Sequence, residues 1–66
     1  MDTKTLFDIF KGAIDDEYNA HELYSNASKN APDAETRKIF RELARDEKTH
    51  LKRLEKRYGQ LRKNLK

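Results

Sequence analysis

The chain has 66 residues, of which 41% are charged and 35% hydrophobic, and its formal net charge is +3. A single core of this size is marginally stable without disulfides, metal or a partner chain, and the absence of cysteine excludes disulfides and thiolate metal sites. No apolar run approaches the ~20 residues of a membrane span and no secretory signal pattern opens the chain, so we expect a cytoplasmic protein of one domain, residues 1–66, with no membrane partner.

The first half of the chain predicts one long helix over residues 3–30. Its apolar positions are alternately four and three residues apart, which is the spacing of a helix that packs lengthwise against a partner helix. This stripe consists of Leu6, Phe10, Ala13, Glu17, Ala20, Tyr24, Ala27 and Ala31. Asp2 or Thr3 is suited to cap the N-terminus of the helix.

A turn is predicted at residues 31–33, around the single proline, Pro32. Proline cannot continue a helix because it lacks the backbone N–H. Asn30 suits a helix C-terminus, and Asp33 suits the N-cap of a new helix. Because the turn is short, the two helices are expected to be antiparallel neighbours.

The second half predicts a helix over residues 34–64, and a stripe of the same spacing continues in phase past Gly59. This second stripe consists of Phe40, Leu43, Glu47, His50, Leu54, Tyr58, Leu61 and Leu65, with Ala44 and Leu51 flanking it. Most of the basic residues follow Arg37 and are interspersed with acids, which is typical of a solvated helix face. Aromatic residues do not interleave with them, so a nucleic-acid partner is not favoured.

Two helices cover only one side of each other, and each keeps an apolar flank that needs a further layer. We therefore expect an all-α fold, an antiparallel helical hairpin that homodimerises into a four-helix bundle. Identical surfaces that meet around a two-fold axis would satisfy this need with one kind of chain.

Three polar residues, Glu17, Glu47 and His50, interrupt the two stripes. Glu47 and His50 are three residues apart, so a helix places them on one face. Glu17 and Glu47 are each fifteen residues from Pro32, so an antiparallel hairpin places them at the same height, ~22 Å from the turn. The three residues are therefore expected to form one cluster.

Burying carboxylates is costly unless they are paired or bound to metal. One hairpin supplies two carboxylates and one imidazole, and two hairpins supply twice as many. Carboxylate and imidazole ligands suit iron or manganese, and zinc also binds them, so we expect two metal ions per dimer. The alternative is a buried, hydrogen-bonded polar trio that specifies the helix register.

The motifs Glu17-x-x-Ala20-x-x-x-Tyr24-x-x-Ala27 and Phe40-x-x-Leu43-Ala44-x-x-Glu47-x-x-His50 carry a family resemblance. Over about residues 7–58 the chain resembles half of a rubrerythrin or another ferritin-like di-iron carboxylate domain. The resemblance implies iron, with Glu17 as a terminal carboxylate ligand, Glu47 as a bridging ligand and His50 as a terminal nitrogen ligand.

The resemblance also implies that Tyr24 lies beside the ligands and that Asp46 accepts the spare imidazole N–H of the partner subunit's His50, which would fix its tautomer. Both residues have plainer interpretations. Tyr24 is also a suitable core aromatic residue, and Asp46 a surface acid that pairs with a nearby Lys or Arg. For His21, four residues after Glu17, a surface or interface role is expected rather than ligation, and Tyr18 is expected at the edge of the bundle.

The resemblance implies an oxidoreductase that uses O2 or peroxide, as a rubrerythrin-like peroxidase or oxidase or as a ferroxidase. The chain departs from a full rubrerythrin because it has two helices instead of four and no cysteine-ligated iron domain, so the electron donor would be a separate protein. The alternative is a non-catalytic helical interaction module, with metal structural or absent and a basic face for a partner. Such a module has no need for three convergent polar residues between its helices.

Overall fold

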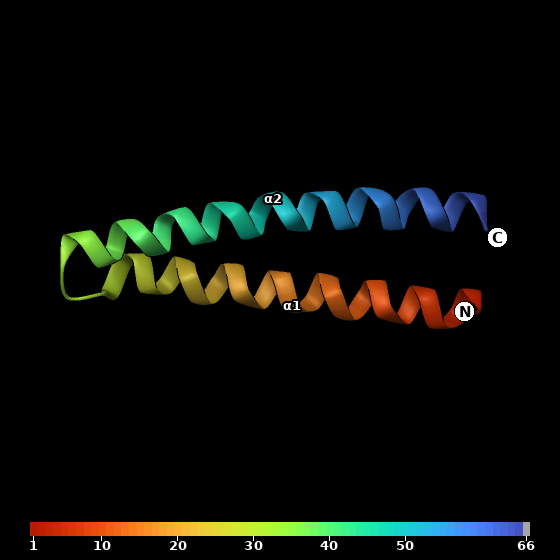
Figure 1. The fold of residues 1–66 in the computed structure, drawn as a ribbon, viewed down its shortest axis with the longest axis horizontal. Coiled ribbons are helices and arrows are strands. Elements are labelled where there is room, and N and C mark those ends of the chain that lie inside the picture. The colour runs from red at the N-terminus through yellow and green to blue at the C-terminus, as the bar shows by residue number, and fades with distance from the viewer. Residues whose placement is uncertain (66) are drawn as a thin grey trace.

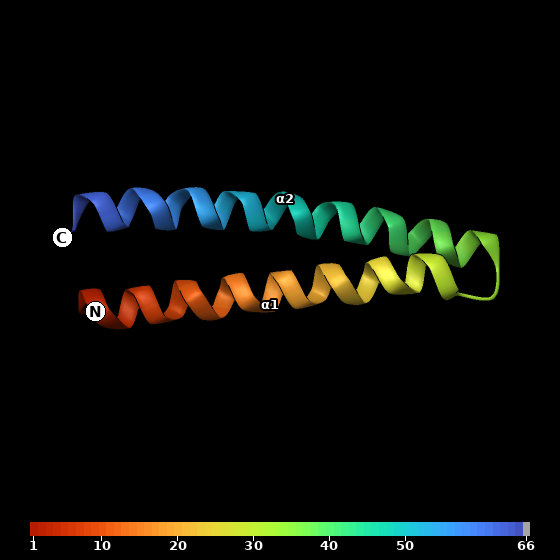
Figure 2. The ribbon, with the colours of Figure 1, turned by 180° about the vertical axis from the view of Figure 1, so that it is seen from behind.

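Two helices joined by a tight turn make up the fold in a computed structural model of the chain, which describes residues 1–65 (Figure 1). Helix α1 is Thr3–Asn30 and helix α2 is Ala34–Asn64. They lie antiparallel in a rod of 49 × 15 × 14 Å, with both chain ends at one end and the turn at the other, as Figure 2 shows from behind. The expected all-α hairpin is confirmed, and α2 passes through Gly59 without ending.

An aspartate caps the N-terminus of each helix. The Asp2 carboxylate accepts a hydrogen bond from the Thr5 backbone N–H at 2.7 Å. Asp33 accepts one from the Thr36 backbone N–H at 2.7 Å and another from the Thr36 hydroxyl at 2.9 Å. Each carboxylate satisfies a backbone donor that the first helical turn leaves unpaired. The caps thus set where the helices begin.

The turn is held by residues on both sides of it. The backbone N–H of Ala31 donates to the Ala27 carbonyl at 2.9 Å and closes the last turn of α1. The Arg37 guanidinium, from the first turns of α2, donates to the Ala31 carbonyl at 2.9 Å. These bonds satisfy groups at the end of α1 that would otherwise lack partners, so the two helices leave the turn at a fixed height relative to each other.

The stripe expected on α1 is confirmed, because all eight of its members are half-buried. The stripe expected on α2 was wrong at three positions, since Leu43, His50 and Leu65 are exposed. From Phe40 onward, the residues of α2 that are buried or half-buried are Phe40, Ala44, Glu47, Leu51, Leu54, Tyr58 and Leu61. This set also alternates steps of four and three, so spacing alone could not choose between Leu43 and the adjacent Ala44.

Aromatic side chains pack between the helices on both sides of the middle. Near the turn, the rings of Tyr24 and Phe40 stack with their centroids 6.0 Å apart. Near the chain ends, Tyr58 meets Phe7 edge-on at 5.6 Å and lies 6.2 Å from Phe10. Such ring pairs add about 0.5–1.5 kcal/mol beyond the area that they bury. They leave the middle of the rod to smaller and polar side chains.

The hairpin has little interior. Among the described residues only Ala44 is buried. The chain exposes 5277 Å², whereas a compact monomer of 7.8 kDa exposes about 4400 Å². The excess of about 900 Å² is close to the roughly 800 Å² that each partner buries in a standard protein–protein interface. Neither helix within the described residues has the apolar length needed to cross a bilayer.

Candidate metal centre

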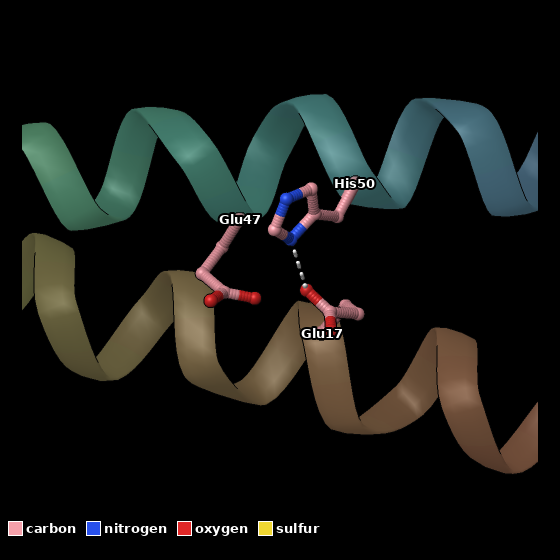
Figure 3. Close-up of side chains that lie close together, drawn as sticks. All are labelled: Glu17, Glu47 and His50. Carbon is pink, nitrogen blue, oxygen red and sulfur yellow. Dashed lines mark ion pairs between the residues drawn. The ribbon is translucent and has the colours of Figure 1, made fainter.

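The three polar residues singled out in the sequence come together near the middle of both helices, and Figure 3 shows their side chains close to one another. Glu17 projects from α1, and Glu47 and His50 project from α2, one turn apart. They meet because the turn at Pro32 folds the chain back at equal distances from Glu17 and Glu47. The expectation that they form one cluster is confirmed.

Each of the three residues offers one ligand atom, and these atoms lie within 4.8 Å of one another. An ion pair within the cluster joins His50 Nδ1 to Glu17 Oε2 at 3.5 Å, drawn as the dashed line in Figure 3. That separation is longer than a good hydrogen bond between these groups. Glu17 Oε2 is buried and has no hydrogen-bond partner. A buried acceptor without a donor is costly, and a cation in the cluster would satisfy it.

The electrostatics of the cluster are set by two acids in contact. The pKa of Glu47 is raised above its ordinary value, chiefly because its protonated form can donate a side-chain hydrogen bond to the neighbouring Glu17 carboxylate, whereas the ionised form cannot. Partial burial and the negative charge of Glu17 act in the same direction, and His50 acts against them. Without a cation, the fold therefore resists having both carboxylates ionised at once.

An open groove of about 550 Å³ leads to the cluster from one side of the hairpin. It is lined by Phe10, Glu17, His50, Arg53, Leu54 and Arg57. The two arginines were interpreted from the sequence only as part of a solvated basic face. Their positions, three and seven residues after His50, are the helical spacing that places them beside it, and this signal could have identified them.

The two residues expected to assist the ligands lie differently. The ring of Tyr24 packs on Phe40, and within the described residues no hydrogen bond joins it to Glu17, Glu47 or His50. Asp46 is exposed and is linked to the cluster only through its charge, which helps to raise the pKa of Glu47. In the single hairpin, Tyr24 serves as a packing residue and Asp46 as a surface acid.

His21 and Tyr18 are not part of the cluster and lie beside a second groove, which shares no residue with the first. His21 is half-buried, and its Nδ1 lies 2.8 Å from the carbonyl oxygen of Ala44. Tyr18 has 52% of its surface exposed. Their positions agree with the interpretation that neither is one of the clustered donors.

The donor set consists of carboxylate oxygens and one imidazole nitrogen, which together suit iron, manganese or zinc. The family model described as rubrerythrin matches residues 8–66 of the chain. That match covers α2, α1 from Asp8 onward, and all three clustered donors. No protein of curated function and no solved structure gives a significant match.

Proposed function

This chain belongs to the rubrerythrin family, and we propose that two copies pair into a four-helix bundle whose interface holds two metal ions. Glu17, Glu47 and His50 of each copy would be the ligands. We propose iron as the metal, which family membership supports, and manganese or zinc would also suit the donors. The function that fits this site is that of an oxidoreductase with O2 or peroxide as the oxidant.

The observation that carries the proposal is the meeting of three donor atoms within 4.8 Å on two different helices. The orphaned Glu17 Oε2 and the raised pKa of Glu47 support it, because both are penalties that a bound cation removes. A trio whose role was only to specify register would be expected to satisfy its own hydrogen bonds.

Two copies are proposed because one copy supplies too few donors. Two carboxylates and one imidazole cannot fill the coordination of two metal ions, whereas four carboxylates and two imidazoles match the ferritin-like arrangement of a Glu from each of two helices and Glu-x-x-His from each of two others. The surface that the hairpin exposes in excess of a compact monomer is also of the size that a stable interface buries.

The exposed side chains indicate which face the second copy would cover. Leu43 and His50 are exposed and lie seven residues apart on one stripe of α2, so the apolar side chain and the imidazole share a face. Ile9 and Leu23 are 53% and 64% exposed and lie fourteen residues apart on one stripe of α1. Covering His50 with a second hairpin would remove water from the site and bring the second set of donors to it.

Bound iron would supply the redox chemistry, in which Fe(II) is oxidised as O2 or peroxide is reduced. The task of the protein is to bind and orient. Glu17 and Glu47 would neutralise the cations and His50 would supply a nitrogen donor, while Arg53 and Arg57 place positive charge along the groove that leads to them. These 66 residues contain no cysteine to bind a thiolate-ligated iron centre, and we propose that a separate donor protein supplies the electrons.

Metal content and oligomeric mass, measured on one sample, test the proposal directly. Chelator-treated protein is given Fe(II) without air, desalted, and examined by elemental analysis and native mass spectrometry. We expect two metal ions for each pair of chains, and near-ultraviolet absorption of bound ferric iron once air is admitted. A single chain with no metal would refute both the pairing and the site.

Matched variants distinguish the loss of a proposed metal ligand from the loss of a negative charge elsewhere on the same helix. Glu17→Gln removes a proposed ligand, and Glu22→Gln removes an exposed acid from the same helix outside the cluster. The first variant is expected to abolish metal uptake while pairing persists, and the second to leave both unchanged. Pairing of the unsubstituted chain without metal uptake would favour the interaction module over the oxidoreductase.

A further inference from the structure

One polar contact between the helices takes no part in the donor cluster. His21, on α1, places Nδ1 at 2.8 Å from the carbonyl oxygen of Ala44, on α2. Within the described residues, no other side chain of α1 forms a hydrogen bond with the backbone of α2. Because a carbonyl only accepts, the imidazole must carry its proton on Nδ1 and donate it.

The packing at Ala44 makes this contact feasible. Ala44 is buried, with 7% of its surface exposed, and its small side chain lets α1 approach the backbone of α2. The Ala44 carbonyl accepts one bond within its own helix and has a second lone pair for the imidazole. A larger residue at position 44 would hold the ring away from this oxygen.

The contact lies next to the proposed ligands on both helices. His21 follows Glu17 by four residues, and Ala44 precedes Glu47 by three, so about one helical turn separates each end of the bond from a carboxylate. Nonpolar packing alone allows small sliding of one helix along the other, whereas a directional bond to a backbone oxygen opposes it. The bond therefore restrains the height of Glu47 relative to Glu17.

We infer that His21 is a positioning residue: its bond to the Ala44 carbonyl sets the register of α1 and α2 at which Glu17, Glu47 and His50 meet around metal. This inference rests on the proposed metal site. His21 is not a ligand itself, because its Nδ1 is engaged by Ala44 and its ring borders the groove that Tyr18 and Lys48 also line, away from Glu17 and His50.

Substitutions at position 21 distinguish positioning from packing. His21→Leu keeps the bulk and removes the donor. His21→Asn keeps an N–H near the position of Nδ1, and His21→Gln moves it to the position of Nε2. Ser25→Ala is the matched control, because Ser25 is half-buried beside the same groove and its hydroxyl forms no hydrogen bond in the described residues.

The readouts are Co(II) affinity and the visible absorption band of bound Co(II), which reports ligand geometry without any catalytic assay. We expect His21→Leu and His21→Gln to weaken Co(II) binding about tenfold, as the loss of outer groups that orient ligands does, and to shift or broaden the band. His21→Asn should retain most of the affinity and the band, and Ser25→Ala all of it. Nitrogen-15 shifts of the unsubstituted protein should show His21 protonated at Nδ1.

Two different failures can be told apart. If His21→Leu and His21→Gln bind Co(II) as tightly as the unsubstituted chain and with the same band, the positioning role is overturned and the metal site stands. If the unsubstituted chain takes up no Co(II), the proposed site and its positioning both fall. Should His21→Leu not fold, as judged by circular dichroism, the comparison of His21→Asn with His21→Gln decides the matter.

Discussion

Replacing Glu47 by Gln should stabilise the metal-free protein and at the same time remove its response to metal. The perturbation exchanges a carboxylate for an amide of nearly the same shape, so packing between the helices changes little. What changes is the repulsion between Glu47 and Glu17, which the metal-free fold must tolerate and which a bound cation removes. A metal ligand that destabilises the metal-free protein is expected to give these opposite effects: its removal raises stability without metal and lowers stability with metal.

The magnitude follows from the geometry. The ligand atoms of the cluster lie within 4.8 Å of one another, and two charges at that separation repel by about 3 kcal/mol at an effective dielectric constant of about 20. Partial exposure of Glu17, at 28% of its side chain, and attraction to His50 reduce the net effect, and we take about 1 kcal/mol per chain. A change of that size raises Tm by roughly 4–8 °C in a domain this small.

Thermal unfolding followed by circular dichroism is the assay, first in chelator at pH 7.5 and then with Co(II). In chelator, Glu47→Gln should melt higher than the unsubstituted chain. With Co(II) at about 100 times its Kd, the unsubstituted chain should gain about 2.7 kcal/mol and the variant almost nothing, so the order reverses. Glu42→Gln, at an exposed acid of the same helix outside the cluster, should change neither measurement.

The pH dependence provides a second check with a definite sign. The pKa of Glu47 is raised in the fold above its ordinary value of 4.5, so the folded state binds a proton more readily than the unfolded state. The resulting stabilisation is complete below pH 4.5 and is lost as the pH rises through the raised pKa. The advantage of Glu47→Gln in chelator should therefore appear in that window and vanish in acid. A variant that melts no higher than the unsubstituted chain at pH 7.5 would refute the reasoning.

Two further predictions concern the scaffold. Asp33→Ala should lower the urea midpoint of unfolding through loss of the α2 cap. Asp33→Asn, which keeps a capping oxygen, should stay close to the unsubstituted chain. An unchanged midpoint for Asp33→Ala would show that the cap contributes nothing. Because hydrogen bonds from Thr36 lower the pKa of Asp33, the contribution of the cap is present above pH 3.8 and lost as the pH falls through the lowered pKa. Tyr58→Ala removes the ring that meets Phe7 and Phe10 and should lower the free energy of unfolding by about 2 kcal/mol, less than for a fully buried aromatic residue. Tyr58→Phe keeps the ring and should change the free energy of unfolding little. An unchanged urea midpoint for Tyr58→Ala would contradict the packing described.

The parts of this fold that depend on local chemistry could be predicted from the sequence. The caps at Asp2 and Asp33 and the turn at Pro32 follow from residue types and their order, and they set the height at which Glu17 and Glu47 meet. The contact face of α2 could not be predicted in full, because Leu43 and Ala44 are neighbours that both fit an apolar stripe. Only the approach of α1 distinguishes them.

Two features could not be predicted from the sequence: a hydrogen bond to a backbone acceptor, and a buried side-chain oxygen without a hydrogen-bond partner. The partner of His21 is a carbonyl oxygen, which every residue has, so no residue type at position 44 marks it as an acceptor. The unpartnered Glu17 Oε2 depends on where His50 comes to rest, at 3.5 Å and not at hydrogen-bonding distance. Such distances depend on how the two helices pack against each other, and the spacing of residues along the sequence does not predict them.

The proposed division of the donors between two hairpins would have a consequence in the cell. With half of the proposed donor set on each chain, metal tightens the association of two chains by the same factor by which association tightens the metal. Dilution of the protein would then weaken metal binding, and scarcity of the metal would weaken the pairing of the chains without abolishing it. A newly made chain, alone with Glu17, Glu47 and an exposed His50, would hold iron weakly until it met a second copy. The proposed reaction of iron with O2 or peroxide would thus begin only when the protein is concentrated enough to pair.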